Sequence, residues 1–66
     1  MLKHNQLLKI REELLMSKAE LAREAGVSPL TISRIENGEN CRAETKRKIL
    51  IALGYDIFDK KIVFTE

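Results

Sequence analysis

The fold of this chain is decided by residues 17–38, which read SKAELAREAGVSPLTISRIENG. Ser17 and Glu20 have the spacing of a capping box, in which a hydroxyl and a carboxylate bond the free backbone N–H groups at a helix start. Apolar and small side chains then recur at helical spacing as far as Gly26, which can enter the left-handed conformation and end a helix without steric penalty. These residues predict one short helix that ends at a glycine.

A second helix is predicted directly after this glycine. Ser28 is a favourable N-cap, and Pro29 suits the first helical position, where an N–H group is not needed. Ile32 and Ile35 give this helix a buried stripe, and residues 37–38, Asn-Gly, close it. Two helices joined by so short a turn indicate a helix-turn-helix.

The composition is that of one small globular domain. The chain has 66 residues, of which 44% are hydrophobic and 33% charged. A chain of this length buries a modest fraction of its surface, so oligomerisation is a common way to stabilise it. The net charge of +2 is only mildly basic. The location of the charges, and not their sum, must therefore indicate a nucleic-acid partner.

Several kinds of chemistry are not expected from this sequence. Cys41 is the only cysteine, so it cannot form an internal disulfide, and together with His4 it offers too few ligands for zinc. We therefore expect neither a metal nor a cofactor. Because no nucleophile–base pair accompanies the single histidine, an enzyme is not expected either. No apolar run is long enough for a membrane span or a signal peptide, so we expect a cytoplasmic protein.

The first helix is predicted over residues 4–15. Its apolar face is expected to consist of four leucines at i, i+1, i+7 and i+8, namely Leu7, Leu8, Leu14 and Leu15. Arg11 lies on the same face, and an unpaired buried charge is unfavourable, so Glu36 is a candidate partner. The alternative is that Arg11 extends over the apolar stripe and reaches water.

The fourth helix is predicted over residues 43–53, and Gly54 ends it. It begins with a run of charged and polar residues, ETKRK, at 44–48. This run either lies in solvent or faces phosphate groups, and the sequence pattern alone leaves both interpretations open.

The last twelve residues, YDIFDKKIVFTE, differ in character from the rest of the chain. They hold all three aromatic residues, and residues 62–64 are β-prone. Because a lone strand leaves backbone groups unpaired, we predict that it pairs with a second subunit. The predicted dimer interface consists of Phe58, Ile62, Val63 and Phe64. Two alternatives stay open: extended packing of the tail on its own domain, and a disordered tail.

Residues 17–38 closely resemble the helix-turn-helix of the phage-repressor/Cro family, also called XRE-like. The resemblance rests on ELA, on GVS at the turn, on TISRIENG and on the later I-x-x-A-L-G, and it covers roughly residues 5–54. It implies a compact, all-α, lambda-repressor-like bundle of four to five helices. We therefore expect a helix-turn-helix DNA-binding domain over 1–56 and a short β-like C-terminal tail over 57–66. In relatives the residues matching Arg11 and Glu36 pair, so the resemblance implies a structural ion pair.

The resemblance also implies a role for individual positions. Residues 28–37 match the recognition helix, which lies in the major groove. The positions that can face bases or the adjacent backbone are Pro29, Leu30, Thr31, Ser33 and Arg34. Arg34 is the strongest candidate, because a guanidinium can bridge O6 and N7 of guanine. Pro29 offers no hydrogen bond, so part of the specificity is expected from DNA shape. The positions expected at the DNA backbone are Lys18, Ser28, Asn37 and Arg42, with Lys46 and Arg47 added from the charged run.

The function predicted on this basis is sequence-specific binding to double-stranded DNA. The protein would be a transcriptional regulator of the repressor type, a homodimer that binds a roughly palindromic operator in the nucleoid. Two other interpretations stay open. One is an antitoxin-like protein that binds its operator while its tail engages a partner protein. The other is a protein-interaction module that has kept the fold but reads no DNA.

Overall fold

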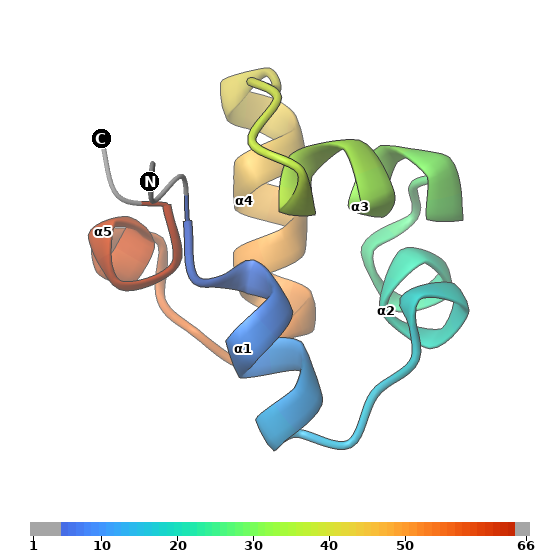
Figure 1. The fold of residues 1–66 in the computed structure, drawn as a ribbon. Helices are drawn as coiled ribbons and strands as arrows, with labels where there is room; N and C mark the ends of the chain where they lie inside the picture. The colour runs from blue at the N-terminus through green and yellow to red at the C-terminus, as the bar shows by residue number, and fades with distance from the viewer. Residues whose placement is uncertain (1–4, 65–66) are drawn as a thin grey trace.

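The computed structural model of the protein describes residues 5–64, which form a small bundle of helices (Figure 1). Its elements are α1 (Leu7–Glu13), α2 (Lys18–Ala25), α3 (Pro29–Glu36), α4 (Ala43–Ala52), the short 3-10 helix η1 (Ile57–Asp59) and α5 (Lys60–Val63). In Figure 1, α4 runs through the middle of the bundle, with α2 and α3 on one side and α5 on the other. His4 and residues 65–66, to which the sequence predictions also referred, lie outside the described residues.

The two helices predicted around the glycine turn are confirmed. The Ser17 hydroxyl accepts a hydrogen bond from the Glu20 N–H at 3.0 Å and so caps α2. Gly26 ends that helix with a φ of 74°, in the left-handed region. Ser28 then caps α3 by accepting from the Thr31 N–H at 3.2 Å, and Pro29 occupies the first helical position. The turn is thus built by local interactions that the sequence already indicates.

The hydrophobic core takes a fully buried side chain from each of the five α-helices. These side chains, all 0% exposed, are Leu7, Leu21, Ile32, Ile49 and Val63. Burial of a large aliphatic side chain stabilises a fold by roughly 1.5–3 kcal/mol. Because no helix buries its apolar stripe alone, all five depend on one another for stability.

The first helix is shorter than predicted, and its buried face is different. It ends at Glu13 instead of residue 15, and its buried residues are Leu7, Ile10 and Arg11. Leu15 lies beyond the helix, 90% exposed, with a left-handed φ of 58°. The reason is a chain reversal in which the Met16 N–H bonds the Arg11 carbonyl at 3.1 Å, a pattern typical of helix C-termini. The four leucines therefore do not share one face.

The C-terminal tail is helical, so the prediction of a β-like tail was wrong. Within residues 5–64 there is no strand, and residues 57–63 form η1 and α5. Asp56 and Asp59 form a capping box that starts this turn, with the Asp56 N–H donating to Asp59 Oδ2 at 3.1 Å. The β-propensity of residues 62–64 is weak compared with the burial that a helical tail achieves against the core.

The tail packs on its own domain, the alternative that the sequence left open, but as helix and not as extended chain. Val63 is 0% exposed and Phe64 is 5% exposed, so neither of these two predicted dimer contacts is available to a second copy in this arrangement. The Gln6 N–H also bonds the Val63 carbonyl at 2.7 Å, which ties the chain before α1 to α5. Of the predicted interface, only Phe58 and Ile62 remain exposed.

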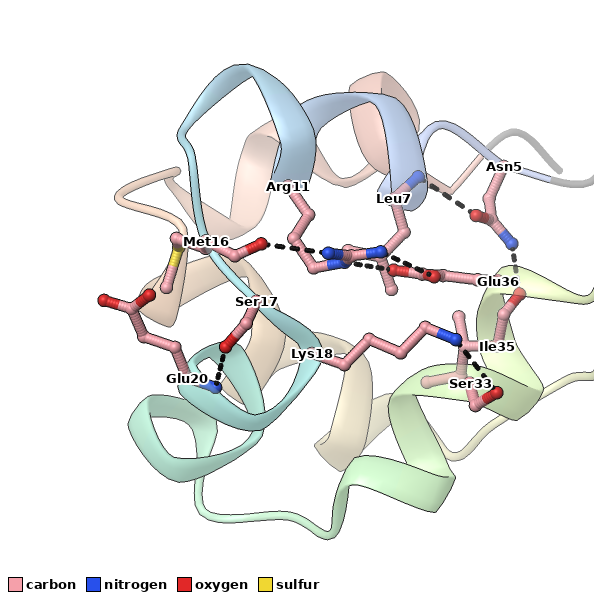
Figure 2. A network of polar contacts seen from close by, with 10 residues as sticks. All are labelled: Asn5, Leu7, Arg11, Met16, Ser17, Lys18, Glu20, Ser33, Ile35 and Glu36. Atoms are coloured by element: carbon pink, nitrogen blue, oxygen red, sulfur yellow. Dashed lines mark hydrogen bonds and ion pairs between the residues drawn. The ribbon is translucent and has the colours of Figure 1, made fainter.

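A buried ion pair joins α1 to the end of α3 (Figure 2). Arg11 Nε donates to Glu36 Oε2 at 2.6 Å and Arg11 Nη2 donates to Glu36 Oε1 at 3.2 Å, while Nη1 donates to the Met16 carbonyl at 2.9 Å. The two side chains are 9% and 5% exposed. The hydrogen bond to Glu36 raises the pKa of Arg11 above its ordinary value, although burial opposes this shift. Arg11 therefore does not extend to water.

We expect Glu36→Gln to lower the free energy of unfolding by about 3 kcal/mol, because it leaves the buried Arg11 charge without its carboxylate. The double variant Arg11→Met/Glu36→Leu should lose much less, because it removes both buried charges together. Urea unfolding measures both. The matched control is Glu44→Gln, which removes the exposed Glu44–Lys48 pair and should change stability by no more than about 0.5 kcal/mol. Equal effects of Glu36→Gln and Glu44→Gln would contradict the role given to the buried pair.

The helical packing of the tail gives a second expectation. Phe64→Ala should destabilise the protein by about 3 kcal/mol, because it removes a buried ring and leaves a cavity. Phe58→Ala changes the same residue type six positions earlier, where the ring is 87% exposed, and should stay within about 0.5 kcal/mol of the parent. Thermal unfolding of the two variants compares them directly. A tail that does not pack on the core would give two equally small effects.

Candidate nucleic-acid interface

The exposed face of α3 is defined by the residues that hold its other face in the core. Ile32 and Ile35 are 0% and 2% exposed and anchor the helix. Leu30 and Arg34, four residues apart, therefore share the outward face. Leu30 is 57% exposed, a large apolar side chain on a surface that no other described element covers. The helix thus offers solvent a guanidinium and an apolar group side by side.

The start of α2 lies next to this face of α3. Lys18, the first residue of α2, donates from Nζ to Ser33 Oγ at 3.3 Å, as Figure 2 shows. Both side chains were predicted to contact DNA, and the structure brings them together. The first N–H groups of a helix and its dipole favour an anion, and Lys18 adds a full positive charge at the same place.

The hydroxyl groups at the start of α3 are engaged in capping. Ser28 Oγ accepts from the Thr31 N–H, and the two side-chain oxygens lie 3.1 Å apart. Thr31 is half-buried, whereas Ser28 and Pro29 are exposed. These residues hold the N-terminus of α3 in position, and Pro29 presents only its ring to a ligand.

The remaining predicted contacts fall into two groups. Asn37, the C-cap of α3, and Arg42, the N-cap of α4, are exposed at the two ends of the loop that follows α3. Lys46 and Arg47 lie further along α4, where they line a hollow shared with η1 and α5. Lys46 Nζ lies 5.6 Å from the centre of the Phe64 ring. The structure therefore does not bring this pair together with Lys18 and α3.

The sequence interpretation missed one residue that supports this surface, Asn5. Its Nδ2 donates to the Ile35 carbonyl at 2.7 Å, and its Oδ1 accepts from the Leu7 N–H at 3.0 Å (Figure 2). Asn5 therefore ties the start of α1 to the end of α3, beside the Arg11–Glu36 pair. A signal was available, because asparagine is favoured where it can bond the free N–H groups of a helix start. The sequence prediction did not use this signal, because it placed the start of the first helix at residue 4 and not at Leu7.

Comparison with known proteins agrees with this geometry. Within residues 5–64 no helix combines the length and the apolar character that a membrane span needs. No curated protein matches the chain. The family model HTH_3, described as helix-turn-helix, matches residues 7–59, which run from the first residue of α1 to the last residue of η1. Since this match takes in both helices around the glycine turn and most of the chain, the protein belongs to the HTH_3 family of Cro/C1-type, XRE-like DNA-binding helix-turn-helix regulators.

Proposed function

We propose that this protein is a transcriptional repressor that reads a specific operator by placing α3 in the major groove of double-stranded DNA. The observation that carries the proposal is the surface formed by Leu30, Arg34 and Lys18. An apolar group and a guanidinium project from one helix, and the N-terminus of a second helix lies beside them. The family match supports DNA binding as the general activity.

The two halves of this surface suit different parts of DNA. We assign Arg34 to O6 and N7 of a guanine and Leu30 to a thymine methyl group, because both side chains are exposed on α3. Lys18 suits a phosphate, and its bond to Ser33 keeps the ammonium beside α3. Further backbone contacts are assigned to Ser28 and Asn37, exposed at the two ends of α3, and to Arg42, exposed at the start of α4.

Few side chains of α3 are free to read bases. Thr31 and Ser33 are already bonded to Ser28 and Lys18 within the protein. We therefore infer that the deformability of the operator contributes to specificity.

We also infer a homodimer in the cytoplasm that binds two half-sites about 34–36 Å apart, because a second α3 doubles the number of side chains that read bases. Ile62, 52% exposed and outside the hollow on α4, is the tail residue that best suits such an interface. A bound dimer would repress by excluding polymerase.

Selection from a pool of random duplexes at moderate salt tests this function. We expect one enriched sequence made of two related half-sites, whose separation reports the geometry of the dimer. The affinity should fall steeply as salt rises, because bound phosphates release counterions. A protein shown to be folded that enriches no sequence would contradict sequence-specific binding and would favour the protein-interaction module.

Two substitutions on the selected operator separate base reading from backbone contact. Arg34→Ala should weaken binding by about 1–3 kcal/mol and relax the preference at one base pair. Lys18→Met should weaken binding to all sequences alike and lower the salt slope by about 1. Lys9→Met, which removes an exposed charge from α1, is the matched control and should change neither property. Fluorescence anisotropy on the operator and on single base-pair variants measures each effect. Unchanged specificity in Arg34→Ala would show that another residue reads the base.

A further inference from the structure

A second surface lies between α4, η1 and α5. Neither α2 nor α3, the helices that carry Lys18, Leu30 and Arg34, contributes a residue to its lining. It is an open hollow of about 520 Å³, a volume within the range of roughly 300–1,000 Å³ that ligand pockets span. Its apolar lining includes Leu50, Phe58 and Phe64. In Figure 1, α5 and α3 lie on opposite sides of α4, so the η1 and α5 residues of the hollow and the recognition helix are on different sides of the bundle.

The apolar lining is held in place by contacts within the domain. The capping box of Asp56 and Asp59 fixes η1, the turn that carries Phe58. Val63 is fully buried and anchors α5, while Lys46 covers the Phe64 ring from 5.6 Å. A binding surface that is ordered in advance loses little conformational entropy when a ligand binds.

Phe58 is the unusual feature of this surface. The ring is 87% exposed although it sits on a fixed turn beside a hollow, and neighbouring Ile57 is 44% exposed. Single exposed apolar residues are common on protein surfaces, but apolar groups that border a concave surface mark interaction sites. An exposed aromatic ring next to a hollow is the type of anchor that dominates binding energy at interfaces.

The charges around the hollow determine what kind of partner it fits. Four basic residues line it, Lys46, Arg47, Lys60 and Lys61, and the described lining contains no acidic residue. If a second copy docked by the same face, these cations would oppose each other, which is unfavourable. A partner that carries carboxylates beside apolar side chains instead complements both the lining and the rim.

We propose that this hollow is a docking site for a short segment of a partner protein in which large apolar residues are flanked by Asp and Glu. The apolar residues contact Ile57 and Phe58, which are the exposed apolar side chains of the lining, and the carboxylates pair with the exposed Arg47, Lys60 and Lys61. This site is separate from the DNA surface. The protein would thus bind DNA with α2 and α3 and a second protein with α4, η1 and α5.

The test is selection of short peptides from a random display library on the intact protein. We expect enriched peptides that combine large apolar residues with Asp or Glu, and whose affinity falls with salt. Phe58→Ala should raise the Kd of a selected peptide by about tenfold or more, because it removes the aromatic anchor. Ile51→Ala is the matched control, since Ile51 is 62% exposed on α4 and does not line the hollow. It should leave the Kd unchanged.

A charge reversal tests the electrostatic part. Lys60→Glu/Lys61→Glu should raise the Kd by about tenfold or more and should shift a repeated selection towards basic peptides. Lys9→Glu/Lys48→Glu changes the net charge by the same amount at two lysines that do not line the hollow. This control should change neither the Kd nor the kind of peptide selected. Failure to enrich peptides, or enrichment of peptides without acidic residues, would overturn the proposal.

Two further results would assign the hollow to another occupant and would also overturn it. One is a dimer in sedimentation that Phe58→Ala converts to monomer, which indicates a second copy. The other is a single-stranded oligonucleotide that displaces the peptide and needs Phe58 to bind. Operator affinity is measured in parallel and should be the same in Phe58→Ala and the parent. If the parent protein bound no operator, the proposed DNA function would be contradicted, whereas the peptide result would still stand.

Discussion

The bonds between Arg11 and Glu36 connect the parts of this small protein that must stay aligned. Arg11 comes from α1 and Glu36 from the end of α3, and a third bond from Arg11 reaches the carbonyl of Met16, just before α2. Removing two charges from water is unfavourable unless their geometry satisfies both. The main effect of the Arg11–Glu36 pair is therefore to orient α1 relative to α3, and not to increase the stability of the fold. Asn5 adds a bond from the start of α1 to the Ile35 carbonyl, so α3 is held at its C-terminal end by two separate tethers.

The central position of α4 divides the surface of the molecule (Figure 1). On one side, α2 and α3 present Lys18, Leu30 and Arg34. On the other, η1 and α5 complete a hollow with a basic rim and an exposed Phe58. The net charge of +2 does not reveal this arrangement, in which Lys18 and Arg34 belong to one surface and Lys46, Arg47, Lys60 and Lys61 to the other. A domain of this size can thus offer two different binding surfaces without a second core.

The sequence predicted most of the fold correctly where the signals are local. The caps at Ser17 and Ser28 and the turn at Gly26 act within a few residues, so their pattern is readable without the tertiary structure. The prediction of α4 was wrong by a single residue at its end. The errors came where distant contacts decide. Leu15 lies outside α1 because the chain reverses before α2, and residues 57–63 are helical because Val63 and Phe64 pack in the core.

By itself the sequence determined the two helices and the turn between them, because capping and helical periodicity are properties of neighbouring residues. The family was predicted through the resemblance of residues 17–38, and the family match confirms it. The residue pattern also offered Glu36 as a candidate partner for Arg11, and the resemblance favoured this pair over an Arg11 that reaches water. Only the tertiary structure decided how Lys18 meets Ser33, where Lys46 and Arg47 lie, and what covers Phe64. These contacts join residues that are far apart in the chain, and the packing of the helices around the core sets them.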